Sequence, residues 1–388
     1  MDLYFDYNAT TPCDRRVVDA MQPLFSEMFG NPSGIHQQAK RATELLEHAR
    51  GQVATLVGAH SSQVIFTSGG SEANNLAIKG YLQGLEQRLE NQPGRIAMSA
   101  IEHPSVSEVF KEMGAAGWDC LTIPVDGACR VDLALLESEL KKGLVLLSIM
   151  AANNETGVIQ DIEAIARLCR RYGTVFHCDA VQLVGKGDVD FNKIGADLLT
   201  ISAHKIYGPK GVGALIFSRS LILKAQILGG GQEQGLRCGT ENMPGIVGFG
   251  AAAETMAQEL DQRIAQLTEL GEYLQKLLKS ELPQATIFGE GAERLPNTLF
   301  FAVPGFEGSS LIMGLDSQGY SLSSGASCGS TKKAPSQVLR AMGVDSELAF
   351  GAVRISLGKM SSRSGIDALI EALRTQVTVM GQMAAVGW

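Results

Sequence analysis

Two charged residues stand directly after apolar, strand-like runs, where a charge is costly unless it has a partner. Asp179 follows the run 175–178, and a carboxylate there needs a cationic partner from the protein or from a ligand. Lys205 follows the run 198–202, and a lysine removed from water has a lowered pKa and becomes an amine nucleophile. The alternative for a lysine is a side chain that extends back to solvent, which suits Lys210 in the glycine-rich loop better. The position of Asp179 therefore indicates a functional site, and the position of Lys205 indicates a reactive amine.

Three further strand ends carry polar residues with both a functional and a structural interpretation. In residues 68–72 (Ser-Gly-Gly-Ser-Glu), two glycines leave backbone N–H groups accessible at the start of a helix, which suits a phosphate. An ordinary helix start capped by Ser71 explains the same residues equally well. No Gly-Lys-Ser/Thr follows, which excludes a Walker A loop. His103 precedes a proline, where a lone histidine is usually structural. Asn153 and Asn154 could hold a turn or bind a ligand.

A phosphate-binding loop, a buried aspartate and a strand-end lysine are the groups that pyridoxal phosphate needs from a protein. The lysine forms a Schiff base with it, and the aspartate keeps the pyridine nitrogen protonated so that the ring withdraws electrons. Each signal is weak by itself, but all three follow strands of one α/β pattern, where the ligands of open sheets collect. The sequence therefore predicts a pyridoxal-phosphate enzyme.

Short apolar runs alternate with helical patterns between about residues 37 and 218. Seven runs resemble buried strands: 64–67, 96–99, 120–123, 144–150, 175–178, 198–202 and 214–217. Most are separated by stretches of helical period: 39–56, 74–89, 133–141 and 162–171. This alternation predicts an α/β fold with a seven-stranded, mostly parallel sheet that helices cover on both faces.

The pattern changes after the three glycines at 229–231. One helical pattern, 246–278, is long enough to join two domains. Beyond it, 297–303 and 352–357 are typical of strands, and 309–315 and 366–379 of helices, while the first dozen residues form an arm. We expect a large domain over residues 15–256. A smaller α+β domain would consist of residues 1–14 and 257–388.

Composition excludes several classes of protein. The 388 residues suggest two or three domains at about 150 residues each. A net charge of −8 argues against nucleic acid or anionic membranes as partners, and no apolar run reaches the ~18 residues that span a bilayer. The N-terminus does not resemble a signal peptide. The seven cysteines form no CxxC motif, so we expect a reduced, cytoplasmic enzyme without a metal, with Cys120 and Cys178 buried in strands.

The sequence resembles a known family almost end to end, from residues 6–12 (Asp-Tyr-Asn-Ala-Thr-Thr-Pro) to 353–358 (Val-Arg-Ile-Ser-Leu-Gly). The most specific segments are 30–33 (Gly-Asn-Pro-Ser), 66–72 (Phe-Thr-Ser-Gly-Gly-Ser-Glu), 202–205 (Ser-Ala-His-Lys), 229–233 (Gly-Gly-Gly-Gln-Glu) and 239–242 (Gly-Thr-Glu-Asn). On these motifs the chain is similar to cysteine desulfurases of the NifS/IscS group. That group belongs to the class V aminotransferase family of fold type I pyridoxal-phosphate enzymes.

The resemblance implies roles for the residues at matching positions. Lys205 would hold the cofactor covalently, and Asp179 would pair with its ring nitrogen. Gln182 would contact the ring hydroxyl, and His103 would stack on the ring and act in proton transfer. The phosphate ligands within the same chain would be Gly70, Ser71, Ser202 and His204. Thr240 would bind the phosphate of the other subunit, in a homodimer with shared sites. Asn154 and Arg354 would clamp the substrate carboxylate, for which an arginine fork is suited.

The resemblance also implies that Cys328 receives sulfur from L-cysteine. Cys328 lies in a small, polar, glycine-containing segment, as a mobile catalytic loop (323–334) would require, and Lys332 and Lys333 would favour its thiolate. The loop departs from the family's usual sequence, and Cys238 stands where serine is usual. These departures leave the behaviour of the loop and the choice of sulfur acceptor open.

We therefore expect an L-cysteine desulfurase, which yields L-alanine and an enzyme persulfide. The persulfide would pass to a sulfur-acceptor protein, for iron–sulfur cluster assembly, thiolation or another sulfur modification. One alternative is a selenocysteine lyase or another class V lyase, which would share every cofactor residue. The other is an inactive homologue that serves as a binding scaffold, against which the presence of Lys205, Asp179, His103 and Cys328 argues.

Overall fold

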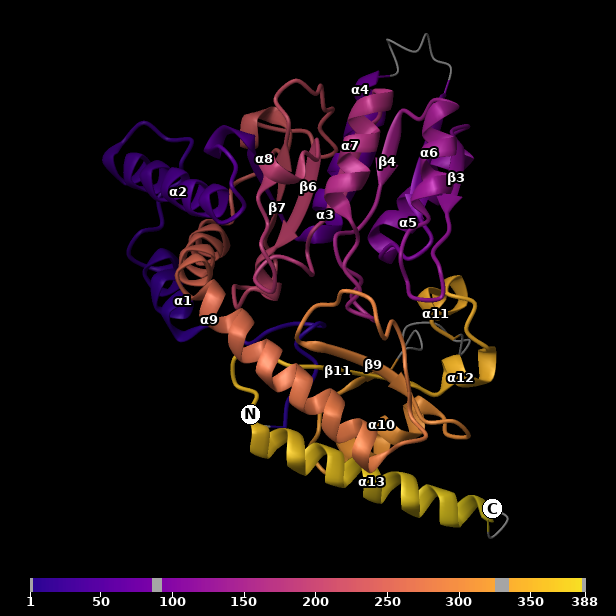
Figure 1. The fold of residues 1–388 in the computed structure, drawn as a ribbon. Helices are drawn as coiled ribbons and strands as arrows, with labels where there is room; N and C mark the ends of the chain where they lie inside the picture. Colours follow the sequence, from indigo (N-terminus) through magenta and orange to yellow (C-terminus); the bar gives the residue numbers. More distant parts are fainter. Residues whose placement is uncertain (1–2, 86–92, 325–334, 386–388) are drawn as a thin grey trace.

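The computed structural model describes residues 3–85, 93–324 and 335–385. It contains a large sheet with helices around it and a smaller sheet below, and the long helix α9 (Met243–Glu281) extends from one to the other (Figure 1). α9 passes through residues 256 and 257 without a break, so the proposed domain boundary stays a prediction.

The large sheet contains the seven strands that the apolar runs predict. These strands are β1 (Val64–Thr67), β2 (Arg95–Ser99), β3 (Asp119–Ile123), β4 (Leu146–Ser148), β5 (Val175–Asp179), β6 (Leu198–Ser202) and β7 (Gly213–Phe217). Their order is β1-β7-β6-β5-β4-β2-β3, and β7 alone runs opposite to the other six strands. The connection from β6 to β7 has no crossover helix, only the turn η4 (Ala203–Lys205), which permits the antiparallel pairing. The prediction of a mostly parallel sheet is confirmed.

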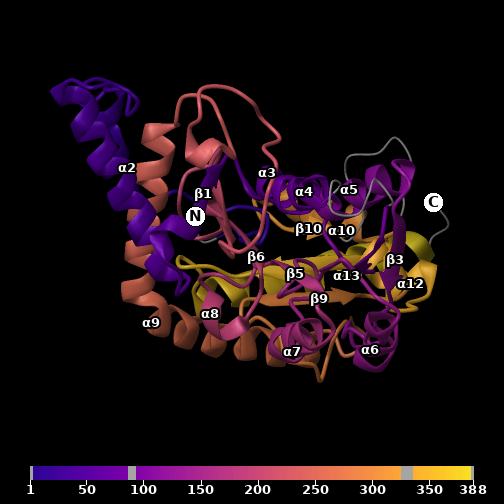
Figure 2. The same cartoon turned by 90° about the horizontal axis from the view of Figure 1, so that it is seen from above.

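Helices cover both faces of this sheet, as Figure 2 shows from above. One face carries α3 (Gly70–Asn75), a π-helical turn (Leu76–Gly80), α4 (Tyr81–Leu85) and α5 (Pro104–Ala115). The other carries α6 (Leu133–Lys141), α7 (Ile162–Tyr172) and α8 (Phe191–Ile194), and α1 (Arg15–Met21) and α2 (Gln37–Leu56) pack on α9 at the side. The predicted helix 74–89 therefore begins at Gly70, and its last residues lie outside the described residues.

Local sequence explains where these helices begin and end. In α7, the side chain of Asp161 accepts a hydrogen bond from the backbone N–H of Ala164 and so caps the first turn. The helix ends at Gly173, which has the left-handed conformation (φ 68°) that glycine adopts without strain. Both ends fix the length of the helix that precedes β5.

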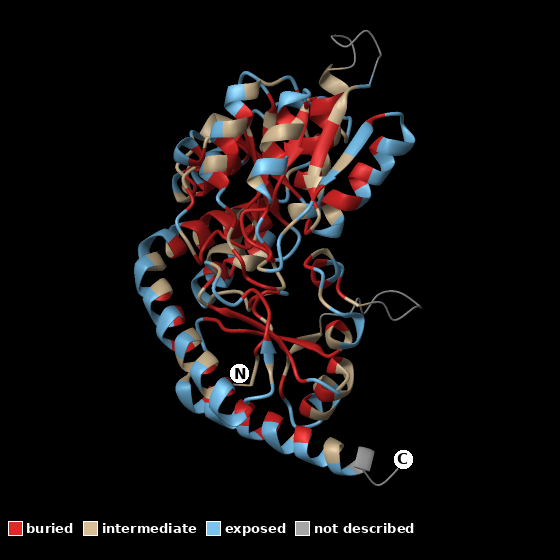
Figure 3. Ribbon diagram, turned by 45° about the vertical axis from the view of Figure 1, so that its right-hand side comes forward, coloured by how far each residue is buried: buried red, intermediate tan, exposed pale blue. Residues whose placement is uncertain are grey.

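The smaller sheet is antiparallel and packs against long helices. Its order is β10 (Ser323–Ser324), β11 (Ala352–Ser356), β9 (Thr298–Ala302) and β8 (Thr286–Ile287). Its helices are α10 (Gly308–Asp316), α11 (Gln337–Ala341), α12 (Ser346–Phe350) and α13 (Arg363–Ala385). Leucines of α9 and α13 meet Phe301 of β9 and Phe5 of the N-terminal segment in one apolar core. Figure 3 shows the central strands of both sheets buried, while α9 and α13 expose their outer faces.

The first residues form the expected arm without a helix, and the arm joins the two sheets. Phe5 N–H donates to the carbonyl of Ser321, and Tyr7 N–H donates to the carbonyl of Ser356, so the arm pairs with the smaller sheet. Thr11 N–H then donates to the carbonyl of His204, beyond β6 of the large sheet. The arm therefore crosses the region where the ends of β5 and β6 meet.

One prediction about the cysteines is wrong. Cys120 is exposed, because β3 is the edge strand of the large sheet and points most of its residues to solvent. Cys178, in the central strand β5, is buried as expected. In residues 3–85, 93–324 and 335–385, no helix is both long and apolar enough to span a membrane.

Candidate active site

The arm and the carboxyl ends of the central strands enclose a cavity of about 440 Å³. Ten residues with predicted roles line it: Gly70, Ser71, His103, Asn154, Asp179, Gln182, Ser202, His204, Lys205 and Arg354. Thr240 does not line it, and Cys328 lies outside the described residues. The structure therefore brings the predicted site together within one chain except for these two residues. The roles of all twelve stay predictions.

Asp179 is a buried carboxylate at the end of β5, with only 6% of its surface exposed. One carboxyl oxygen accepts a hydrogen bond from Val181 N–H at 3.0 Å, and the other accepts one from Asn74 Nδ2 at 2.8 Å. Among the described residues, no cation lies within 4 Å of it. Because neutral donors offset the burial of a charge only in part, this carboxylate suits a cationic group in the cavity. The protonated ring nitrogen of pyridoxal phosphate is such a group.

Lys205 presents its amine to the same cavity from the turn that follows β6. Its Nζ donates to the backbone carbonyls of Asn8 at 2.5 Å and Ala9 at 2.7 Å, so the arm orients it. Burial and, to a smaller extent, the positive charge of Arg354 lower the pKa of Lys205, the carboxylates Asp6 and Asp179 oppose this shift, and the resulting pKa is about 8. At pH 7 about a tenth of this amine is therefore uncharged and nucleophilic, far more than for an ordinary lysine.

The turn between β1 and α3 forms a tight backbone cradle beside Ser202. An added Cβ at Gly213 of β7 would lie 2.7 Å from the carbonyl carbon of Gly69, so the strand packs directly on the turn. α3 begins at Gly70 without a side-chain cap, and Ser71 is its second residue. The reading of Ser71 as an ordinary helix cap is therefore wrong, and the first N–H groups of α3 stay free to bind an anion.

His204 and Ser202 line the cavity together with this cradle. His204 Nδ1 lies 3.2 Å from Thr10 Oγ1 of the arm. Burial and, to a smaller extent, the positive charges of Lys205 and Lys210 together lower the pKa of His204 to about 4. The ring is therefore neutral, and its environment is one of positive potential, which favours a phosphate.

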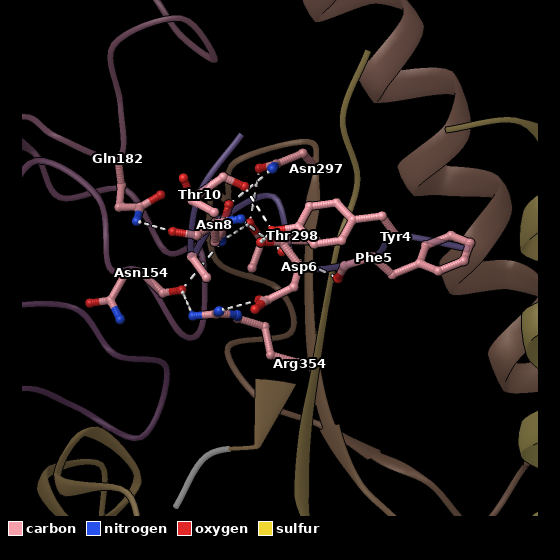
Figure 4. Close-up of polar contacts among 12 residues, drawn as sticks. Tyr4, Phe5, Asp6, Asn8, Thr10, Asn154, Gln182, Asn297, Thr298 and Arg354 are labelled. Atoms are coloured by element: carbon pink, nitrogen blue, oxygen red, sulfur yellow. Dashed lines mark hydrogen bonds and ion pairs between the residues drawn. The ribbon is translucent and has the colours of Figure 1, made fainter. Parts of the chain in front are cut away.

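Arg354 of β11 brings the smaller sheet into the site (Figure 4). Its Nη1 donates to the carbonyl of Asn154 at 2.9 Å, and its Nη2 donates to Asp6 Oδ1 at 2.6 Å. Its Nε is buried and has no partner among the described residues. The guanidinium is thus held at the cavity by two hydrogen bonds. Its other N–H groups can still donate to a ligand, as a carboxylate clamp requires.

Several residues that the sequence reasoning gave no role hold these groups in place. Asn8 donates from Nδ2 to Thr298 Oγ1 at 2.8 Å, and its carbonyl accepts from Gln182 Nε2 at 3.0 Å as well as from Lys205. The resemblance gave a signal here, because the segment 6–12 belongs to it. Asp6 belongs to the same segment, whereas no sequence pattern pointed to the contacts of Asn74.

These observations fit pyridoxal 5′-phosphate. The cavity has the volume of a small-ligand site, and a backbone cradle at its wall suits the phosphate. The Asp179 carboxylate, which has neutral hydrogen-bond donors, and the Lys205 amine of lowered pKa line the same cavity. In the described part of the chain, no three His, Cys, Asp or Glu side chains gather as metal ligands would.

The chain matches known proteins over almost its whole length. Residues 3–369 match the family described as Aminotransferase class-V. A relative named cysteine desulfurase IscS, from Dictyoglomus turgidum, is 40% identical over 381 residues, which cover 96% of each chain.

Two solved structures are similar as well. One, named NifS-like protein, has a TM-score of 0.89 and 35% identity, over 98% of this chain and 100% of its own. Another, SspA in complex with cysteine, has a TM-score of 0.81 and 32% identity, over 92% of this chain and 99% of its own.

Proposed function

This chain belongs to the class-V aminotransferase family, and we propose that it is a cysteine desulfurase that converts L-cysteine into L-alanine and an enzyme-bound persulfide. Family members use pyridoxal 5′-phosphate, and relatives at about 40% identity are named cysteine desulfurases. One observation carries the proposal most: the Lys205 amine, of lowered pKa, shares a cavity with the unpaired Asp179 carboxylate and the Arg354 guanidinium. A structural neighbour in complex with cysteine supports this substrate.

Each residue of the site has a chemical task in this proposal. Pyridoxal phosphate, when bound, supplies a ring that withdraws electrons from the substrate's α-carbon. Asp179 would keep a negative charge beside the ring nitrogen, and Arg354 with Asn154 would bind the substrate carboxylate. Lys205, as an uncharged amine, would accept the α-proton and later return a proton to carbon. His103 would stack on the ring and assist proton transfer.

Cys328 is proposed as the group that takes the sulfur. Its thiolate would attack the substrate sulfur, so that a sulfur–sulfur bond forms while the carbon–sulfur bond breaks and its electron pair stays with carbon. This role rests on the resemblance, because Cys328 lies outside the described residues. A sulfur-acceptor protein would then remove the persulfide sulfur, for iron–sulfur cluster assembly, thiolation or another modification.

We propose a homodimer whose sites are shared. Thr240 is exposed and does not line the cavity of its own chain, which supports a role in the partner's phosphate site. Four large apolar side chains, three in residues 25–35 and one at the start of the segment that leads to Thr240, are exposed: Phe25, Phe29, Ile35 and Leu228. A second subunit would remove such surface from water.

Turnover of L-cysteine tests the proposal. The purified protein, with a thiol reductant present, should release alanine and sulfide in equal amounts. Lys205→Ala should abolish both products. Lys210→Ala, which changes an exposed lysine in the same glycine-rich loop, should keep both. Full turnover by Lys205→Ala would contradict the assignment.

The same assay separates the alternatives. A Cys328→Ala protein that acts fully on selenocysteine and not on cysteine would indicate a selenocysteine lyase. A wild-type protein that binds cofactor and turns over neither substrate would indicate a scaffold protein.

A further inference from the structure

His103 caps the helix α5 with its ring. The residue has extended backbone dihedrals (φ −63°, ψ 148°), and its Nδ1 accepts a hydrogen bond from the backbone N–H of Ser105 at 3.1 Å. A backbone N–H is always a donor, so an Nδ1 that faces it must carry no proton. The helix start thus already restricts which ring nitrogen can be protonated.

A second donor reaches the same nitrogen. Ser105 Oγ lies 2.8 Å from His103 Nδ1, and the Nδ2 of Asn74 lies 2.9 Å from Ser105 Oγ and 2.8 Å from Asp179 Oδ2. An ionised Asp179 only accepts hydrogen bonds, so the amide of Asn74 must turn its NH2 group towards it. The second hydrogen of this NH2 group then goes to Ser105 Oγ, which leaves the serine hydrogen to donate to His103.

We propose that Asn74 and Ser105 are positioning residues that hold His103 as the neutral tautomer with its proton on Nε2. The hydrogen bonds run in one direction, from Asn74 to both Asp179 and Ser105, and from Ser105 to Nδ1. Nε2 has no hydrogen-bond partner among the described residues, and His103 lines the cavity. The ring therefore presents an N–H donor to whatever occupies the site.

The inference deepens the proposed function, on which its catalytic meaning rests. A second proton on His103 would have to go to Nδ1, and it would break the hydrogen bond from Ser105 N–H at the start of α5 and reverse the one with the Ser105 hydroxyl. Partial loss of hydration at the cavity wall lowers the pKa of His103, Asp179 opposes this shift, and Lys205 adds to it. His103 thus enters the reaction as a neutral hydrogen-bond donor, and proton uptake by its ring is coupled to the loss of the helix cap.

The state of the ring can be measured without any turnover. The chain has six histidines, so a holoenzyme with 15N in its histidine rings gives few signals, and those of His103 are assigned by their loss in His103→Gln. We expect a Nδ1 signal of the unprotonated type and a Nε2 signal that is coupled to a proton. A Nδ1 that carries the proton, or an average of the two tautomers, would overturn the proposal.

Three variants separate positioning from a structural role. Ser105→Ala removes one donor to Nδ1 and should raise the titration midpoint of His103 by roughly half to one pH unit. Ser105→Thr keeps the hydroxyl and should restore the wild-type midpoint. Ser107→Ala, a buried serine of the same helix that does not line the cavity, should leave it unchanged.

His60 provides an internal reference in the same spectra. Its Nδ1 also accepts from a backbone N–H two residues later, that of Ser62 at 3.2 Å, and it lies 2.8 Å from the Ser62 hydroxyl. Its signals should be the same in wild type and in Ser105→Ala. An unchanged His103 midpoint in Ser105→Ala would overturn the role of the serine, whether or not the protein desulfurates cysteine.

Discussion

Removal of the Glu233 carboxylate should destabilise the fold by about 3 kcal/mol, because it leaves a buried charge without its main partner. Arg50 and Glu233 form a two-pronged ion pair at 2.7 and 2.8 Å, and both side chains are at least nine-tenths buried. The same carboxylate accepts a hydrogen bond from Phe66 N–H in β1 at 2.8 Å. Glu233→Ala would therefore leave one charge and one backbone donor without these partners.

The structure sets the size of this effect. Breaking a buried ion pair typically costs about 3–5 kcal/mol. The partly exposed Glu47, 3.1 Å from Arg50 Nε, remains as a second partner, so we expect the lower end of the range. The penalty for the unpaired N–H of Phe66 overlaps with this cost and does not add to it in full.

Denaturant unfolding of three variants provides the measurement. Glu233→Ala should lose about 3 kcal/mol, and Glu47→Ala, which removes the exposed partner, under about 1 kcal/mol. The double variant Arg50→Met with Glu233→Leu removes both charges and should be more stable than Glu233→Ala alone. If Glu233→Ala and Glu47→Ala lose equal stability, the reasoning about the buried pair is refuted.

The remaining predictions concern the site. Asp179→Ala should lower the rate of alanine production far more than the content of bound cofactor, since the phosphate cradle and Lys205 still hold the ring. If the absorbance of bound pyridoxal phosphate and the rate of alanine production fall equally, Asp179 has no electronic role. In cofactor-free protein, the rate at which Lys205 attaches pyridoxal phosphate should rise about tenfold per pH unit and level off above about pH 8, where the amine is uncharged; a rise that continues to pH 10 would show an unperturbed lysine. Mixing Lys205→Ala with an inactive Thr240→Glu protein should restore about a quarter of the activity, because half of the dimers carry one intact site; no recovery would place Thr240 outside the partner's site.

The hydrophobic periodicity of the sequence predicts the large sheet. The free-energy cost of burying a charge identifies Asp179 and Lys205 as candidate site residues. Both signals are local, since each depends only on residues next to one another in the chain. Thus β1, β6 and α6 have the expected bounds, and the ends of β5 and β6 carry the two charged groups.

Other features depend on contacts that local patterns do not encode. Arg354 pairs with Asp6 across 348 positions, and the carbonyl of Asn8 accepts from Lys205 across 197. Only the resemblance pointed to Arg354, and nothing gave a role to Asp6. The exposure of Cys120 follows from the position of β3 at the edge of the sheet, which the composition of the strand does not reveal.

The destination of the sulfur tests the central claim most directly. After brief exposure to L-cysteine, mass spectrometry of wild-type peptides should find one additional sulfur on the peptide that contains Cys328, and Lys205→Ala should show none. Cys328→Ser should form no persulfide while it still binds pyridoxal phosphate. The absence of added sulfur from every wild-type peptide would contradict the desulfurase proposal, and sulfur mainly on Cys238 would contradict the assignment of Cys328.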